Sequence, residues 1–160
     1  MREKLNRYLL QICAVLLGLM VLAATWQVAS RYVFNHPSSF TDELLRYMLI
    51  WLTFLGAPLA YGMNKQMAVT FLTDKFSEKG KVFVDFFVVI MMILFGAVVL
   101  FIGGIMVTNN AIWQTSPSLH LNMAIVYVSI PLSGVLFTLY AVDEFRTLMK
   151  RKNSVKKEEV

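Results

Sequence analysis

The sequence predicts an all-α integral membrane protein with four transmembrane helices. Apolar residues make up 58% of its 160 residues, and the mean hydropathy is +0.62, which is too apolar for an ordinary soluble domain. Two stretches, residues 8–30 and 86–142, contain no Asp, Glu, Lys or Arg. The first can cross about 30 Å of hydrocarbon once, and the second can cross it twice. With one further span between them, over residues 43–62, we expect a single four-span membrane domain over residues 1–160.

The first span covers residues 8–30 and follows a basic segment, residues 1–7. A basic start before an apolar run is also typical of a cleaved signal peptide. However, the run is longer than the usual signal core of about 7 to 15 residues, and Trp26 and Gln27 follow where a cleavage site requires small residues. We therefore expect an uncleaved transmembrane helix.

A short polar link joins this span to the second, which covers residues 43–62. Pro37 disfavours helical geometry at the residue before it, so the chain is expected to turn there. Ser39 or Thr41 can then cap the next helix through a side-chain oxygen. The two spans therefore form a helical hairpin.

Three charged side chains lie at the start of the second span: Asp42, Glu43 and Arg46. Because residues three and four positions apart share neighbouring surface on a helix, these side chains are expected to lie close together. Two interpretations remain open. The charges form a solvated ion pair at the membrane surface, or they form a polar clamp that holds a partner protein.

Residues 64–81 mix polar and apolar side chains. On a helical wheel Val69, Leu72 and Phe76 share one face, which predicts an amphipathic helix over residues 66–79 in the headgroup layer. The alternative is a plain soluble loop. In the first case four lysines are candidates for binding lipid phosphates: Lys65, Lys75, Lys79 and Lys81.

The long uncharged stretch supplies the third and fourth spans, over residues 82–107 and 123–145. The turn-forming sequence NNAIWQTSPSLHLN, residues 109–122, separates them. Small residues at Gly96 and Gly103–Gly104 can form a face on the third span that another helix approaches closely.

Pro131 interrupts the fourth span and is expected to kink it, because proline lacks the backbone N–H that a helix uses. The hydroxyl groups of Ser129 and Ser133 are available to hydrogen-bond the carbonyl groups that proline leaves free.

Charge distribution predicts the orientation. Nearly all Lys and Arg residues lie in the N-terminal segment, in residues 64–81 and in the C-terminal tail, whereas residues 109–122 have none. By the positive-inside rule both termini are cytoplasmic. The net charge of +5 could suggest nucleic acid, but the basic residues lie at the ends of apolar runs. Anionic lipid headgroups are the expected partner, and nucleic acid is not.

The sequence contains no pattern that indicates catalysis, and we expect neither an enzyme nor a cofactor. The predicted spans hold no ionisable group near their middle, where a carrier usually needs one. His36 and His120 have no second His or Cys at metal-ligand spacing, and Cys13 is the sole cysteine. The residues thus favour an accessory subunit that docks beside a larger membrane protein. Two alternatives are a membrane anchor for a redox complex and a free-standing small exporter.

The strings QVASRYVFN and DELLRYMLIWLTFLGA resemble the signature of the DctQ family, the small membrane subunits of tripartite ATP-independent periplasmic (TRAP) transporters. The resemblance continues more weakly through Tyr61, Gly62, Pro117, Tyr127 and Pro131. One departure is that this chain has Gln66 and Met67 where family members often have a histidine shortly after the Tyr-Gly pair. A role that requires imidazole there is not expected.

This resemblance implies a multi-pass protein of the bacterial inner membrane that pairs with a large membrane subunit. The large subunit carries the sodium and substrate sites. A periplasmic substrate-binding protein delivers organic acids such as sialic acid or C4-dicarboxylates. By this analogy Arg31, Asp42, Glu43 and Arg46 are candidates for contact with the large subunit or the binding protein.

Overall fold

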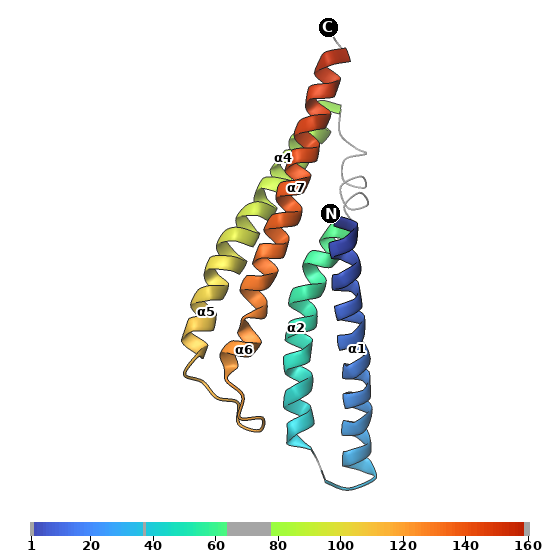
Figure 1. Ribbon diagram of the computed structural model, residues 1–160, viewed down its shortest axis with the longest axis vertical. Coiled ribbons are helices and arrows are strands. Elements are labelled where there is room, and N and C mark those ends of the chain that lie inside the picture. Colours follow the sequence, from blue (N-terminus) through green and yellow to red (C-terminus); the bar gives the residue numbers. More distant parts are fainter. Residues whose placement is uncertain (1, 37, 64–77, 159–160) are drawn as a thin grey trace.

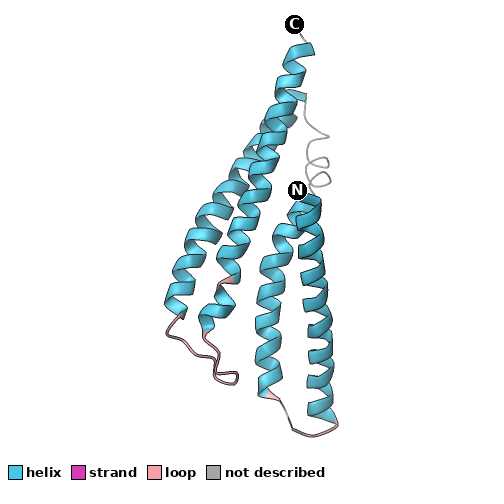
Figure 2. Cartoon of the chain, in the orientation of Figure 1, coloured by secondary structure: helices cyan, strands magenta, loops and turns pink. Residues whose placement is uncertain are grey.

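The computed structural model describes residues 2–36, 38–63 and 78–158, and these fold into helices joined by two loops (Figures 1 and 2). The helices are α1 (Arg2–Tyr32), α2 (Ser39–Met63), α4 (Glu78–Leu94), the π-helix η1 (Phe95–Ile102), α5 (Gly103–Ala111), α6 (Met123–Tyr127) and α7 (Ser129–Glu158). In the described part of the chain, no β-strand is formed. The single antiparallel bridge there, between Thr115 and Asn122, belongs to a loop.

Four helical stretches are long and apolar enough to cross a membrane: Arg2–Tyr32, Ser39–Met63, Val84–Ala111 and Met123–Lys150. This confirms the prediction of an all-α protein with four transmembrane helices. The third stretch runs without interruption through α4, η1 and α5. The predicted amphipathic helix, residues 66–79, lies almost wholly outside the described residues, as do Lys65 and Lys75, while Lys79 and Lys81 belong to the start of α4.

The helices pack side by side in the order α1, α2, α7 and then the α4–η1–α5 span. Figure 1 shows the two resulting hairpins, with both connecting loops at the same end of the molecule and the N-terminus at the other. Backbone contact between α1 and α7 is absent from the described chain, so the four spans form a row and not a closed bundle. Half of the α6–α7 span is buried, against 11% of α1, which makes α7 the central helix.

A buried apolar cluster joins α1, α2 and α7 near the N-terminal end of α1. Its members are Leu9, Leu55, Leu59, Leu136 and Tyr140. Tyr140 is almost fully buried, and it lies against Gly62, where an added Cβ atom would be 2.8 Å from the tyrosine ring. The absence of a side chain at Gly62 therefore lets α2 and α7 approach each other.

Close approach of the third and fourth spans also depends on glycine. A Cβ atom at Gly104 would lie 2.7 Å from the Pro131 backbone nitrogen, and one at Gly134 would lie 2.6 Å from the Phe101 nitrogen. Gly96 faces Thr138 in the same way, at 2.9 Å. The expectation for Gly103 was wrong, because it meets only a carbonyl oxygen of its own helix. Gly103 was wrongly assigned to this face because η1 lies directly before it, and the wider turn of a π-helix changes which residues share a face.

The fourth span is interrupted at Val128, between α6 and α7. Ser129 donates a hydrogen bond to the Val126 carbonyl oxygen at 2.8 Å, whereas the carbonyl that Pro131 leaves free in a regular helix is that of Tyr127. The expected role of Ser129 is therefore not what the structure shows. The expectation for Ser133 was also wrong. Its hydroxyl is buried and has no hydrogen-bond partner in the described part of the chain.

Candidate partner-binding site

The site begins where the chain turns between α1 and α2. Asn35 takes a left-handed conformation with φ of 52°, which asparagine tolerates better than most residues. Helix α2 is capped by Ser38, whose side-chain oxygen accepts a hydrogen bond from the Thr41 backbone N–H at 3.4 Å. The expected cap was Ser39 or Thr41. The cap lies one residue earlier because α2 already begins at Ser39.

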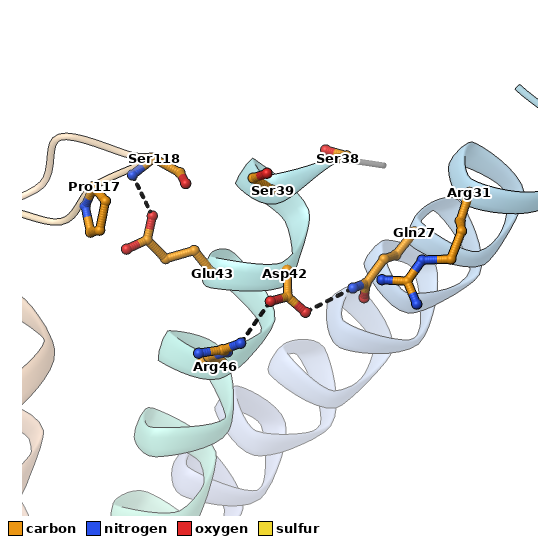
Figure 3. A pocket seen from close by; sticks show the side chains of 9 residues that line it. All are labelled: Gln27, Arg31, Ser38, Ser39, Asp42, Glu43, Arg46, Pro117 and Ser118. Atoms are coloured by element: carbon orange, nitrogen blue, oxygen red, sulfur yellow. Dashed lines mark hydrogen bonds and ion pairs between the residues drawn. The ribbon is translucent and has the colours of Figure 1, made fainter. Parts of the chain in front are cut away.

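Asp42 lies between two donors from different helices (Figure 3). One carboxylate oxygen accepts a hydrogen bond from the Gln27 side chain on α1 at 2.9 Å, and the other accepts one from Arg46 at 2.8 Å. The Asp42–Arg46 contact is also an ion pair across one helical turn. Asp42 thus connects the end of α1 to the start of α2. Sequence reasoning missed Gln27, although it lies four residues before Arg31 and so on the same side of the helix.

Glu43 is adjacent in sequence to Asp42 but points to the other hairpin. One carboxylate oxygen accepts a hydrogen bond from the Tyr47 hydroxyl at 2.5 Å. The other accepts the backbone N–H groups of Ser118 and Leu119, at 2.8 and 3.0 Å. The expected group of three charges is therefore divided, because Arg46 pairs with Asp42 while Glu43 fastens the loop of residues 112–122 to α2.

Internal hydrogen bonds hold this 112–122 loop in one shape. Ser116 is buried, its backbone N–H donates to the Leu121 carbonyl at 2.9 Å, and its side-chain oxygen accepts from the Leu119 N–H at 3.2 Å. His120 takes a left-handed conformation with φ of 51°. Turn-forming residues in the sequence predicted a loop here. They gave no signal that the loop binds Glu43, about 75 positions away in the chain.

A pocket of about 270 Å³ lies where the two hairpins meet at this end of the molecule. We call it the interhairpin pocket. It is lined by Gln27, Arg31, Ser38, Ser39, Asp42, Glu43, Arg46, Pro117 and Ser118. All four residues that the sequence singled out as partner contacts, including the exposed Arg31, thus come together in one site. Pro117 and Ser118, from the second hairpin, were not expected there.

A second polar cluster joins the helices at the opposite end of the molecule. Arg2 forms an ion pair with Asp143 and donates to the Tyr140 carbonyl at 3.1 Å. Asn6 accepts a hydrogen bond from the Tyr140 hydroxyl. We call this group of Arg2, Asn6, Tyr140 and Asp143 the N-terminal latch. Nearby, the Tyr61 hydroxyl donates to Glu144 at 3.1 Å.

The described residues contain no group of three His, Cys, Asp or Glu side chains that could hold a metal ion. His36 and His120 are exposed in separate loops, and Cys13 is a partly buried free thiol on α1. The chemistry of the site is therefore that of hydrogen bonds and ion pairs between helices.

A row of four apolar helices with polar contacts at both ends defines a multi-pass membrane protein. Residues 20–151 match the family model described as the DctQ component of tripartite ATP-independent periplasmic transporters. The match covers most of the chain, and the chain belongs to this family. The family consists of transporter components, so the chain is a transport protein and not an enzyme. This assignment favours the transporter interpretation over a redox-complex anchor.

Three relatives extend the comparison. A putative TRAP transporter small permease protein of Haemophilus influenzae is 38% identical over 90 residues, which is 56% of each chain. The sialic acid TRAP transporter small permease protein SiaQ of Vibrio cholerae is 23% identical over 94% of this chain and 86% of its own. The sialic acid TRAP transporter permease protein SiaT of H. influenzae is 26% identical over 69% of this chain and 18% of its own.

Proposed function

We propose that this chain is the small permease subunit of a TRAP transporter and that it holds the large membrane subunit in place during uptake. The family match over residues 20–151 is the observation that carries this proposal. A partner is implied by the small permease relatives, whose name refers to one component of a transporter. The relation to SiaT supports the same view, since there the similar segment is a small part of a much longer permease.

The arrangement of the helices supports a scaffold role. A row of four helices does not enclose a path for solute, and it leaves long apolar surfaces for a neighbouring membrane protein. Polar contacts at both ends fix the two hairpins against each other. Arg2 lies in the first turn of α1, Glu43 lies near the start of α2, and Asp143 follows the uncharged stretch that ends at residue 142.

We further propose that the complex takes up organic acids such as sialic acid or C4-dicarboxylates with sodium. The names of the V. cholerae and H. influenzae relatives favour sialic acid. The sodium and substrate sites would belong to the large subunit, and a periplasmic binding protein would deliver the acid. In this proposal the chain lies in the bacterial inner membrane with both termini in the cytoplasm, as the distribution of basic residues predicts.

Within this complex we place Arg31, Asp42, Glu43 and Arg46 at contacts with the large subunit or the binding protein. Support comes from their position together at one end of the molecule, around a pocket. Lys65, Lys75, Lys79 and Lys81 remain candidates for contact with lipid phosphates. Removing the charges at Glu43 and Arg46 should reduce assembly of the complex or uptake. If assembly and uptake both stayed unchanged, Glu43 and Arg46 would make contacts only within this chain.

A reconstitution experiment tests the function. The chain, its large permease partner and the binding protein are placed in proteoliposomes with an inward sodium gradient, and uptake of labelled sialic acid and succinate is measured. We expect uptake only when all three proteins are present, and copurification of the chain with the large permease. Uptake without this chain would contradict the proposal, and so would accumulation by this chain alone.

A further inference from the structure

The π-helix η1 determines which residues of the third span face α7. Gly96 and Gly104 both lie against α7, at Thr138 and Pro131, and they are eight residues apart. In a regular α-helix two such residues would point about 80° apart, because eight residues exceed two turns of 3.6. A π-turn takes in one residue more than an α-turn. Thus η1 places eight residues, and not seven, between the two glycines that contact α7.

A regular α-helix through the same segment would bring Gly103 to α7, since seven residues make nearly two turns. Gly103 now points elsewhere, and an added Cβ atom there meets only the Val98 carbonyl oxygen, at 3.9 Å. At Gly104 an added Cβ atom would lie 2.7 Å from the Pro131 nitrogen, so this place accepts no side chain. Because two glycines are adjacent, either of them can occupy it.

The rest of α5 is nearly as compatible with this second register. One step along, Val107 would take the place of Thr108, which has the same branched shape. The Thr108 hydroxyl donates to the Gly104 carbonyl of its own helix at 2.8 Å, so this hydrogen bond moves with α5. The exception is Asn110, which is exposed and would take the place of Ala111, a side chain only 2% exposed. Burying the amide costs free energy, so the register with η1 is the more stable one.

A slip in the other direction is blocked. If α5 stayed in place and α4 moved instead, Ala97 would take the place of Gly96. A Cβ atom there lies 2.9 Å from the Thr138 hydroxyl oxygen and 3.1 Å from the Phe137 Cβ atom. Only α5 has a pair of glycines at its contact with the neighbouring span, so α5 is the part that can move.

We propose that the third span is a two-register switch, in which η1 converts to α-helix and α5 advances by one residue, so that Gly103 replaces Gly104 against Pro131. This step turns α5 by about 100° and moves it about 1.5 Å toward the 112–122 loop. Register shifts of helices take microseconds to milliseconds. Both registers belong to this chain alone, so the switch does not depend on the proposed partners.

The 112–122 loop couples this switch to the first hairpin. It follows α5 directly (Figure 1), and the Ile112 carbonyl accepts a hydrogen bond from Asn122 at 2.8 Å. Glu43 on α2 holds the same loop through Ser118 and Leu119. An advance of α5 displaces a loop that is held at both places. The Glu43 contact therefore favours the register with η1, and loss of that contact favours the second register by the same free energy.

Nuclear Overhauser effects between protons show which glycine faces Pro131. The full chain, isotopically labelled in glycine and proline, is measured in phosphatidylcholine nanodiscs. In the unsubstituted chain we expect a contact between Gly104 Hα and Pro131 Hδ. In Gly104→Ala a contact from Gly103 to Pro131 should replace it. The matched control, Gly103→Ala, adds the same methyl group one position earlier and should keep the Gly104 contact, because that methyl group excludes the second register.

Asn110→Ala tests the switch without adding bulk, in case Gly104→Ala does not fold. It removes the amide that the second register must bury, so the population of that register should rise on the order of tenfold. Combining it with Gly103→Ala should reverse the effect. Glu43→Ala should raise the same population at least about threefold, whereas Asp42→Ala, which leaves the loop contact intact, should not.

Two results would overturn the proposal. One is a folded Asn110→Ala variant with no contact between Gly103 and Pro131 and no microsecond-to-millisecond exchange in α5. The other is the same rise of the second register in Asn110→Ala with and without Gly103→Ala. Equal responses to Glu43→Ala and Asp42→Ala would overturn the coupling to the first hairpin.

Discussion

Neighbouring residues in this protein have different tasks, and Asp42 and Glu43 show it most clearly. Successive positions on a helix point about 100° apart. Asp42 therefore faces α1, where it binds Gln27, while Glu43 faces the second hairpin and binds the 112–122 loop. A pair of acids that looks like one charged patch in the sequence is two separate contacts in the structure.

This division can be tested by hydrogen exchange. Glu43→Ala removes the acceptor for the N–H groups of Ser118 and Leu119, so exchange in a peptide covering residues 115–122 should accelerate about five- to tenfold. Asp42→Ala is the matched control and should leave that peptide unchanged while it releases Gln27. If both substitutions accelerated hydrogen exchange in this peptide equally, the loop would not be held specifically by Glu43.

The N-terminal latch makes a related prediction about α1. Arg2, Asn6 and Leu9 contact residues of α7 or of the core cluster they share with it, so α1 is built into the fold. Intact-mass analysis of the purified protein should find these residues attached, because a cleaved signal peptide would remove them. A mature protein that starts after residue 24 would contradict this and would remove Leu9 from the core.

At the scale of the elements, glycine determines how closely the third and fourth spans pack. Gly104 and Gly134 lie against backbone atoms of the opposite span. Backbone atoms cannot rotate away as the end of a side chain can. The π-helix η1 lies directly between Leu94 and Gly103 and packs along α7. We infer that its wide turn keeps Gly96 and Gly104 on the face toward α7.

Two neighbouring glycines provide a direct comparison. Gly104→Ala places a methyl group 2.7 Å from the Pro131 nitrogen and should destabilise the protein by about 1 to 3 kcal/mol. Gly103→Ala meets nothing closer than 3.9 Å and should be neutral or stabilising by up to about 1 kcal/mol, because alanine favours the helix. Thermal unfolding in detergent measures both. Similar melting temperatures for the two variants would refute the packing argument.

The sequence predicted the elements better than the contacts between them. Uncharged stretches of sufficient length indicate membrane helices almost regardless of context, so four spans could be read directly from residues 8–30, 47–62 and 86–142. The contacts of Glu43 with Ser118 and Leu119 could not, since they join segments far apart in the chain. Gly134 was missed for the same reason, because an isolated glycine shows its importance only when its neighbour is known.

At the scale of the whole molecule, the two hairpins have their loops at one end and the N-terminus at the other. The charge distribution predicts that the loop end is periplasmic. A cysteine introduced at Asn35 or His120, both exposed, should therefore react with a membrane-impermeant maleimide added to intact spheroplasts. Cysteine in place of Arg7 should react only after the membrane is opened. The reverse pattern would invert the proposed orientation and would place the interhairpin pocket in the cytoplasm.

The single-file order of the spans also has a mechanical consequence. A layer one helix thick is only about 10 Å across. It therefore bends more easily along the contact lines, or seams, between neighbouring helices than a bundle in which every helix has several neighbours. The seam between α2 and α7 divides the layer into its two hairpins. Glu43 crosses that seam at one end, and Tyr61 crosses it with Glu144 near the other. These polar bridges oppose bending at the two ends of the seam, and the apolar cluster of Leu55, Leu59, Leu136 and Tyr140 opposes it between them.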